Sequence, residues 1–126
     1  MVKALLSIKP EYVAKILTGE KTFEFRRKVF KRDDVDTLVI YASAPIQRVV
    51  AEARIRRIHT DTPESIWENT HTRGGISHDK YMAYFHDTTV AHAIELSNVN
   101  KFDIPLRLSE YTPRLTCPPQ SFAYIQ

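Results

Sequence analysis

The stretch of sequence that decides the fold spans residues 3–26 and reads KALLSIKPEYVAKILTGEKTFEFR. Residues 3–9 are mostly apolar and predict a short strand. Pro10 follows at the first position of a helix, where its missing amide hydrogen costs no hydrogen bond. Apolar side chains then recur at helical spacing until Gly19, which favours the end of a helix. From residue 21 the apolar period changes to two, which predicts a second strand.

The second strand places chemically different side chains on its two faces. Phe23 and Phe25 point one way, while Glu24 and Arg26 point the other way and lie about 7 Å apart along the chain. Lys21 stands at the mouth of this strand. An ammonium, a carboxylate and a guanidinium that converge on one cavity can bind a base edge or a phosphate, or act as a base and an electrostatic stabiliser. On an exposed face the same groups would form solvated ion pairs of little energetic value.

The rest of the chain predicts strands and short helices without the regular alternation of a parallel α/β sheet. Further strands are predicted at residues 37–43, 49–56, 89–98 and 102–108. Two short helices are expected to begin after Thr62 and Ser77, because both residue types are preferred N-caps. A short apolar run at the C-terminus could close a sheet edge. This order favours a small, mainly antiparallel barrel with helices packed over its openings.

The composition is that of one ordinary globular domain and excludes several classes of protein. The chain has 126 residues, of which 43% are hydrophobic and 26% charged, and we expect residues 1–126 to form a single domain. Its single cysteine, Cys117, excludes an internal disulfide framework and favours a reducing, cytoplasmic setting. No apolar run approaches the ~18 residues of a membrane-spanning helix, and the N-terminus lacks the core of a signal peptide. We therefore expect no membrane partner and no secretion.

Charge is distributed unevenly along the chain. The net charge is +3, but residues 1–60 carry 13 basic and 7 acidic residues, whereas residues 61–126 carry 5 and 8. A basic half suggests an anionic partner such as RNA, DNA or a nucleotide. The predicted nucleic-acid surface consists of Arg27, Lys28, Lys31, Arg54 and Arg56. The alternative is a solvated sheet face whose positive charge is offset by neighbouring carboxylates.

The sequence predicts neither a metal site nor a cofactor. Five histidines are present, but none stands four residues from another, and no spacing matches a zinc template. Cys117 has no histidine or base near it in sequence that would activate the thiol. Three glycines are too few for a phosphate-binding loop. Function is therefore expected to reside in the polar residues around the second strand.

The segment GEKTFEFR at residues 19–26 has the pattern G-x-K-x-x-E-x-R, and with the strand and helix before it this pattern resembles the ASCH domain, a member of the PUA-like superfamily. Residues 39–43, 75–77 and 118–122 are also similar to this family, so the resemblance covers essentially the whole chain. It implies an α+β, mainly β fold, a pseudo-barrel of five or six mostly antiparallel strands with two or three short helices. It also implies a cleft beside the first helix, in a superfamily that commonly binds RNA or modified bases.

A ligand site follows from this resemblance. Lys21, Glu24 and Arg26 would supply polar recognition in the cleft, and Tyr84 or Phe122 would offer a ring on which a base can stack. The other expected ligand-binding residues are Ser7, Lys9, Tyr41, Ser43, Gln120 and Ser121, although the spacing of Tyr41 is also that of a core residue. The expected partner is RNA or a modified nucleoside or nucleotide. DNA is an alternative partner that the sequence does not exclude, and the sequence identifies no protein partner.

An enzymatic alternative is implied by the same resemblance. Related small ASCH proteins include an amidohydrolase that removes an acyl group from N4-acetylcytidine, using a Lys, a Thr three residues later and a downstream Glu. Lys21 matches the first position, but Glu24 stands at the Thr position, and no carboxylate lies around residues 72–74. Ribonuclease activity has also been proposed for some ASCH proteins. In an enzyme of either kind, Lys21 and Glu24 are the expected acid–base pair.

Overall fold

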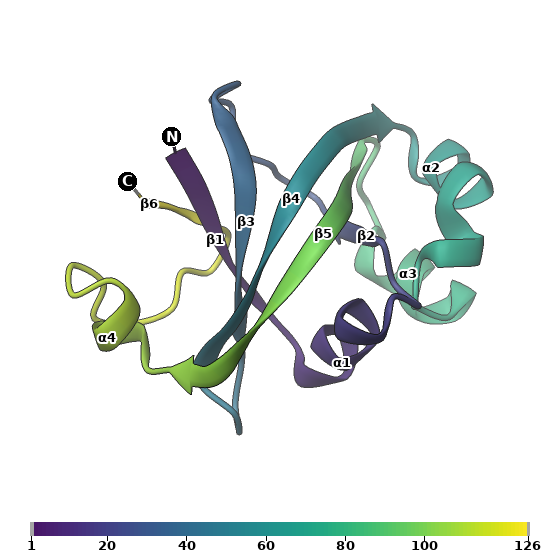
Figure 1. The fold of residues 1–126 in the computed structure, drawn as a ribbon. Coiled ribbons are helices and arrows are strands. Elements are labelled where there is room, and N and C mark those ends of the chain that lie inside the picture. Colours follow the sequence, from purple (N-terminus) through teal and green to yellow (C-terminus); the bar gives the residue numbers. More distant parts are fainter. Residues whose placement is uncertain (1, 126) are drawn as a thin grey trace.

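The computed structural model of the chain describes residues 2–125 (Figure 1). In chain order its elements are β1 (Val2–Ile8), α1 (Pro10–Thr18), β2 (Phe23–Arg26), β3 (Val35–Ala42), β4 (Arg48–Asp61), α2 (Pro63–Thr70), a 3-10 turn η1 (His71–Arg73), α3 (His78–Tyr84), β5 (Ala91–Leu106), α4 (Leu108–Tyr111) and β6 (Ala123–Ile125). None of the helices in the described range is long and apolar enough to cross a membrane.

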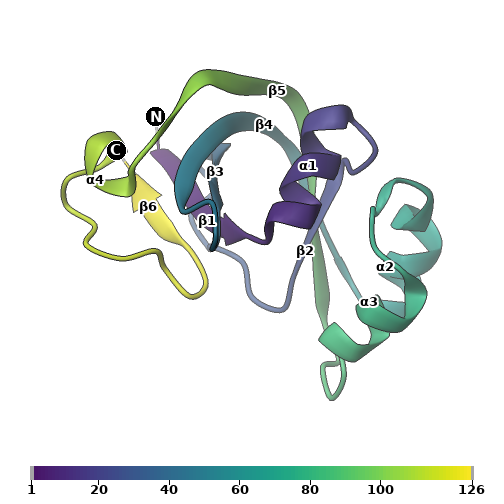
Figure 2. The same cartoon turned by 90° about the horizontal axis from the view of Figure 1, so that it is seen from below.

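The six strands form one curled sheet in the order β2-β5-β4-β3-β1-β6. β1 and β3 run parallel, and every other neighbouring pair is antiparallel. Figure 2 shows the sheet curled around its interior, but the edge strands β2 and β6 do not pair, so the barrel stays open. The predicted mainly β pseudo-barrel is thereby confirmed. The expectation of two or three helices is too low, because the described residues form four.

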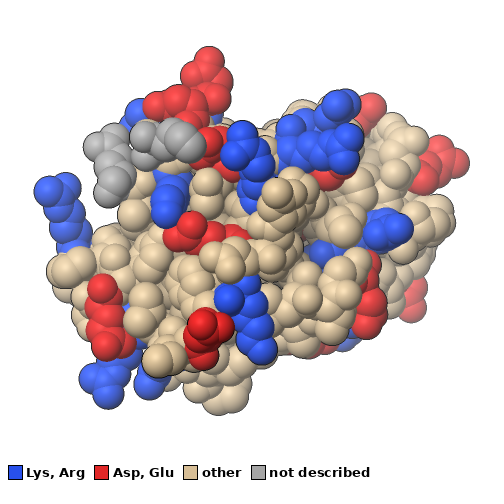
Figure 3. Space-filling view, in the orientation of Figure 1, with Lys and Arg blue, Asp and Glu red and all other residues tan. Residues whose placement is uncertain are grey.

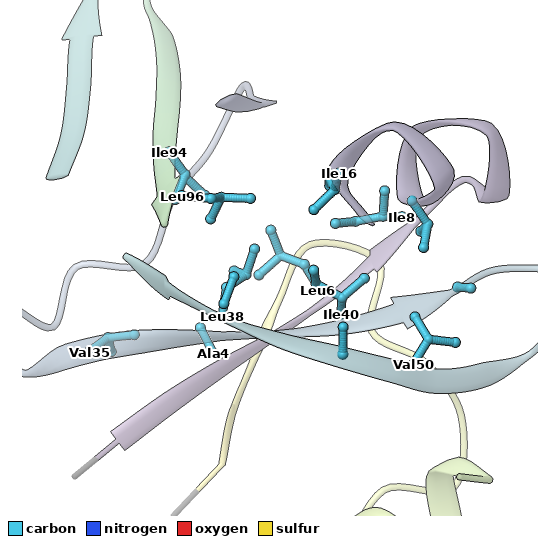
Figure 4. Close-up of a cluster of buried hydrophobic side chains, with 14 of the residues drawn as sticks. Ala4, Leu6, Ile8, Ile16, Val35, Leu38, Ile40, Val50, Ile94 and Leu96 are labelled. Carbon is cyan, nitrogen blue, oxygen red and sulfur yellow. The ribbon is translucent and has the colours of Figure 1, made fainter. Parts of the chain in front are cut away.

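The main core lies inside the curl, where the alternation of each strand sends every second side chain. Side chains of β1 and β3 meet those of β5 there, and Ile16 of α1 closes one end (Figure 4). Labelled members of this core include Ala4, Leu6, Ile8, Leu38, Ile40, Ile94 and Leu96, each at most 5% exposed. Burial of Ile16 fixes α1 against the sheet, and Gly19 ends the helix with φ 86. The segment that leads into β2 therefore starts from a fixed point.

A second cluster holds α2 and α3 against β2 and the first part of β5. Tyr81 of α3 is fully buried, donates a hydrogen bond to the carbonyl of Pro63 at 2.7 Å and packs edge-on against Phe25 of β2. The N-caps expected at Thr62 and Ser77 are confirmed, because their hydroxyls accept from the backbone amides of the first helical turns. Figure 2 shows α1 on one side of β2 and the α2–α3 pair on the other.

Two elements of the structure differ from what the sequence predicts. The strands expected at residues 89–98 and 102–108 form one strand, β5, which bends at an irregular register with β4 and has φ 50 at Asn98. The strand continues because β4 offers hydrogen-bond partners on both sides of the bend. The second difference is α4, which is too short for a periodic apolar pattern. Its capping comes from Glu110, whose carboxylate accepts from the amide of Arg107 at 2.8 Å.

Candidate ligand-binding site

A pocket of about 560 Å³ opens where the end of β1, the start of α1, β2 and α3 meet. Its size lies within the range of small-molecule sites in proteins. Residues singled out from the sequence that line it are Ser7, Lys9, Lys21, Glu24, Arg26 and Tyr84. Apolar and aromatic side chains from α1 and the loop before α3 form other parts of its wall. The pocket therefore combines a charged floor with rings from two helices.

Lys21 is the buried cation of this site, with 3% of its surface exposed. Its Nζ donates to the carbonyl of Gly74 at 2.6 Å and lies 5.2 Å from the ring centre of Tyr12 and 4.7 Å from that of Phe25. Burial lowers the pKa of Lys21, and the nearby Glu24 carboxylate partly opposes that shift. Lys21 therefore releases its proton more readily than a solvated lysine.

The loop of residues 73–75 packs directly onto Lys21. The carbonyl of Arg73 accepts from the amide of Thr22 at 2.9 Å, and the carbonyl of Gly75 accepts from Nζ of Lys15 at 3.3 Å. Gly75 has φ 62, and a Cβ atom added there would lie 2.7 Å from Cβ of Lys21. Only glycine fits both this conformation and this approach. The loop thus sets the position of the buried ammonium.

Glu24 and Arg26 form an ion pair along the pocket floor. Nε and Nη2 of Arg26 each lie 3.0 Å from Oε2 of Glu24, and the two side chains are 14% and 8% exposed. Oε1 of Glu24 makes no hydrogen bond within residues 2–125, yet no fully buried side-chain oxygen or nitrogen in that range lacks a partner. Oε1 therefore faces the open pocket. It offers one charged acceptor to a ligand.

Arg26 also connects the two edges of the open barrel. From the end of β2 its Nη2 donates to the carbonyl of Ser7 in β1 at 2.9 Å, and its Nη1 donates to the carbonyl of Ser121 at 3.5 Å. Ser121 lies just before β6, the opposite edge strand. Because the guanidinium is held by three partners, it is a fixed part of the pocket wall.

The rim of the pocket joins two helices. Oε2 of Glu11 on α1 lies 3.6 Å from Nζ of Lys80 on α3, and both side chains are largely exposed. Tyr12 on α1 and Tyr84 on α3 line the pocket below this pair. Burial raises the pKa of Tyr12, and the carboxylates of Glu11 and Glu24 add to that shift, so its hydroxyl stays protonated at neutral pH.

The model of the ASCH domain family matches residues 6–105. This chain belongs to the ASCH domain family. It is 30% identical over 94 residues to an ASCH domain-containing ribonuclease of Zymomonas mobilis, a match that covers 75% of this chain and 64% of that protein. The chain thus matches slightly less than two thirds of the length of that relative.

Solved structures agree with this family membership. The crystal structure of ASCH from Zymomonas mobilis is 28% identical and covers 98% of this chain and 87% of that one, with a TM-score of 0.89. The structure of one of its variants gives the same TM-score at 27% identity, with 98% and 90% covered. The N-terminal domain of Staphylothermus marinus McrB shares the fold at 10% identity and a TM-score of 0.52, over 91% of this chain and 80% of that one.

Two residues expected in the ASCH cleft lie elsewhere. Tyr41 is 4% exposed and packs with Leu5 and Val39 on the sheet face that α4 covers. Strand parity sends it there, because Leu38 and Ile40 of the same strand point into the main core. Ser43 follows β3, where its amide donates to the carbonyl of Ile8 at 2.9 Å, and it does not line the pocket.

Gln120 and Ser121 line a second pocket, which also contains Arg26 and Tyr84. Phe122 lines neither pocket. Its ring is partly buried against the main core and lies edge-on to Phe30, with ring centres 5.8 Å apart. The C-terminal segment therefore contributes to the second pocket through Gln120 and Ser121, while Phe122 fixes it to the barrel.

The predicted basic surface is divided between separate places. Arg27 and Lys28 line the second pocket, whereas Arg54 and Arg56 belong to β4, and Lys31 lies in the loop before β3. Figure 3 shows basic side chains gathered over β4 on one face, with acidic and uncharged side chains between them and the others. The five residues therefore come from two segments, the loop between β2 and β3 and the strand β4.

Sequence reasoning missed several lining residues, among them Tyr12, Ile76 and Lys80. Tyr12 had the spacing of a core residue, and α3 reaches the pocket only through tertiary packing. The pair Gly74-Gly75 was the one available signal, because such a pair in a chain with three glycines indicates a close approach. Within residues 2–125 no group of three or more His, Cys, Asp or Glu side chains is placed to hold a metal ion.

Proposed function

We propose that this ASCH domain binds single-stranded RNA and takes one base into the pocket between α1 and α3. The observation that carries the proposal is the free Oε1 of Glu24, which faces the pocket beside the buried ammonium of Lys21. A base edge that carries an amino group can donate to this oxygen, while the ring contacts Tyr12 or Tyr84. Each base stacked on an aromatic ring gains about 1–3 kcal/mol.

A single strand is the expected form of the ligand. A base can enter a pocket of this depth only if it is unstacked and unpaired, and RNA-binding proteins read sequence mainly in such segments. The name of the Zymomonas mobilis relative, an ASCH domain-containing ribonuclease, supports RNA as the nucleic acid. An A-form duplex would present only its backbone to the rim, because its bases stay stacked inside.

Fluorescence anisotropy with a labelled 12-nucleotide RNA tests this proposal against the same sequence as RNA duplex and as single-stranded DNA. Lys21→Met keeps most of the side-chain volume that packs under Gly75 but removes the charge. Lys101→Ala removes an exposed basic residue that does not line the pocket. We expect tightest binding to the single-stranded RNA, at least tenfold weaker binding by Lys21→Met and little change in Lys101→Ala. Equal affinities of the parent and both variants would refute the site.

A second candidate function is RNA cleavage, favoured by the lowered pKa of Lys21 beside a free carboxylate oxygen. In this reaction Oε1 of Glu24 accepts the proton of a ribose 2′-hydroxyl, and the 2′-oxygen attacks the adjacent phosphorus. The bond from phosphorus to the 5′-oxygen breaks, and the leaving oxygen takes a proton from Lys21. The products are a 2′,3′-cyclic phosphate and a free 5′-hydroxyl, and exchange with water restores both side chains.

Incubation with end-labelled RNA separates cleavage from binding alone. Cleavage predicts fragments that end in a cyclic phosphate by mass spectrometry, and their loss in Lys21→Met and in Glu24→Gln purified in parallel. Saturable RNA binding without cleavage fragments would support the binding function and would reject nuclease activity. N4-acetylcytidine is incubated under the same conditions, and release of acetate would instead favour an amidohydrolase. The Glu24 position, where related amidohydrolases have Thr, speaks against that outcome.

A further inference from the structure

We propose that the ligand extends beyond one nucleotide, and that the second pocket holds the sugar–phosphate of the nucleotide next to the bound base. This inference rests on the proposed RNA-binding function and assigns its substrate class as an oligonucleotide of at least two residues. The second pocket has a volume of about 580 Å³ and shares Arg26 and Tyr84 with the first. The two cavities are therefore neighbours across one pair of side chains.

The side chains of the second pocket suit an anion. Arg27 and Lys28 contribute two positive charges, and neither forms an ion pair within residues 2–125. The guanidinium of Arg27 lies 4.9 Å from the ring centre of Tyr84, which places it at the boundary with the first pocket. The remaining polar groups include the hydroxyls of Thr88 and Thr89. Such hydroxyls and cations are the usual partners of phosphate oxygens.

One carboxylate, Asp87, also lines this pocket, but its Oδ2 lies 3.3 Å from Nε2 of His86 and the side chain is 88% exposed. A charge that is this exposed to solvent is well screened. Both pockets carry more basic than acidic side chains, but their basic side chains differ in pairing. In the first pocket Arg26 pairs with Glu24, Lys80 pairs with Glu11, and Lys21 donates to the carbonyl of Gly74. In the second pocket Arg27 and Lys28 form no ion pair within residues 2–125. This difference favours a base in the first pocket and a phosphate in the second.

The side chains between the two pockets are held firmly enough to direct the path of a bound oligonucleotide. Arg26 is held by Glu24 and by the carbonyls of Ser7 and Ser121, and Tyr84 accepts from the amide of Arg27 at 3.4 Å. A nucleotide whose base enters the first pocket thus finds its neighbouring phosphate beside Arg27 and Lys28. A free nucleoside would occupy the first pocket alone.

The test compares ligands of increasing length with a double variant. Affinities are measured by NMR titration for a nucleoside monophosphate and by anisotropy for a dinucleotide and a 12-mer of the same base. The parent is compared with Arg27→Ala/Lys28→Ala and with Lys101→Ala, an exposed basic control that lines neither pocket. We expect the affinity of the parent to rise at least tenfold from the monophosphate to the dinucleotide. The double variant should lose most of that increase in affinity. Lys101→Ala should keep the full increase.

Salt dependence gives a second readout. Loss of two phosphate contacts should reduce the slope of log K against log salt for the 12-mer by about 1.4, at roughly 0.7 for each contact on a single strand. Equal weakening of all ligands in the double variant, or no weakening at all, would overturn the second site while leaving the base pocket intact. Failure of every ligand to bind, with Lys21→Met unchanged from the parent, would instead reject the proposed function. Equally tight, Arg27-dependent binding of polyglutamate would assign the pocket to an acidic protein.

Discussion

Gly75 and Lys21 are in such close contact that a Cβ atom on Gly75 would lie 2.7 Å from Cβ of Lys21. Real Cβ atoms do not approach other carbons this closely in a packed interior. The loop after η1 and Lys21, two positions before β2, therefore act as one packed unit. The buried ammonium is placed by a backbone segment that is distant in sequence.

Gly75→Ala is predicted to weaken RNA binding because it displaces Lys21 from the pocket floor. Gly19→Ala is the matched control, since Gly19 also has positive φ, at 86, but has no heavy atom within 4 Å of its Cβ position. Each substitution should cost about 1 kcal/mol from backbone strain. We expect at least tenfold weaker RNA binding for Gly75→Ala only, measured by anisotropy with urea unfolding in parallel. Equal effects of Gly75→Ala and Gly19→Ala on RNA binding would show that the position of Lys21 does not depend on its contact with Gly75.

The stability of the parent should rise with pH relative to Lys21→Met. Burial lowers the pKa of Lys21 in the folded chain, whereas an unfolded lysine titrates near about 10.4. Between these two pKa values the unfolded chain binds more protons than the folded one, so the free energy of unfolding increases as pH rises. Urea unfolding of both proteins from pH 7 to about 10.5 measures this difference, in which the titration of the other groups cancels. A difference that is constant across the range would contradict a lowered pKa.

Much of this site was predictable from local sequence, and the remainder depends on contacts between distant segments. Strand periodicity placed Glu24 and Arg26 on one face, and Pro10 and Gly19 marked the ends of α1. Periodicity could not show that Glu24 is 6% exposed, because α1 and α3 cover it. Polar alternation usually indicates a solvated face, and here helices from elsewhere in the chain cover that face.

Tyr41 is a residue that we expected in the site and that the structure buries elsewhere. The apolar run of residues 38–42 indicates a strand, and the structure buries its side chains on both faces of the sheet, but a continuous apolar run does not reveal which face meets which neighbour. Once the structure sets the register of β3 between β1 and β4, parity sends Tyr41 to the side covered by α4. Motif resemblance predicts a cleft beside the first helix, while the register of β3 decides that Tyr41 does not line the pocket there.

Arg26→Lys is predicted to destabilise the fold by about 1–3 kcal/mol, the range expected for lost hydrogen bonds to charged groups. Lysine keeps the positive charge but cannot reach Glu24, Ser7 and Ser121 at once, so the edges of the barrel lose their connection. Arg56→Lys is the control, because Arg56 is 66% exposed and its Nε lies 3.7 Å from Glu95. Urea unfolding should show a clear loss for Arg26→Lys and almost none for Arg56→Lys. Equal stabilities would mean that the three contacts of Arg26 contribute little.

Glu24→Gln is predicted to change which base the pocket prefers. In the parent, Oε1 of Glu24 accepts from a base, which favours cytosine over uracil because only cytosine presents an amino group beside its ring nitrogen. In the variant the amide oxygen stays with Arg26, so the amide nitrogen turns toward the pocket and donates. Affinities for C12 and U12 RNA should therefore reverse their order, by about fivefold from one hydrogen bond of ~1 kcal/mol.

Glu11→Gln is the matched control for this reversal, since Glu11 also lines the pocket but pairs with Lys80 at the rim. Both variants remove one negative charge, which should strengthen binding of C12 and U12 by the same small factor, but only Glu24→Gln also removes the acceptor that cytosine uses. Only the ratio of the C12 and U12 affinities reports on the base contact, and we expect it to change in Glu24→Gln alone. If both variants keep the ratio of the parent, Glu24 does not touch the base and the pocket binds RNA through its rings and cations.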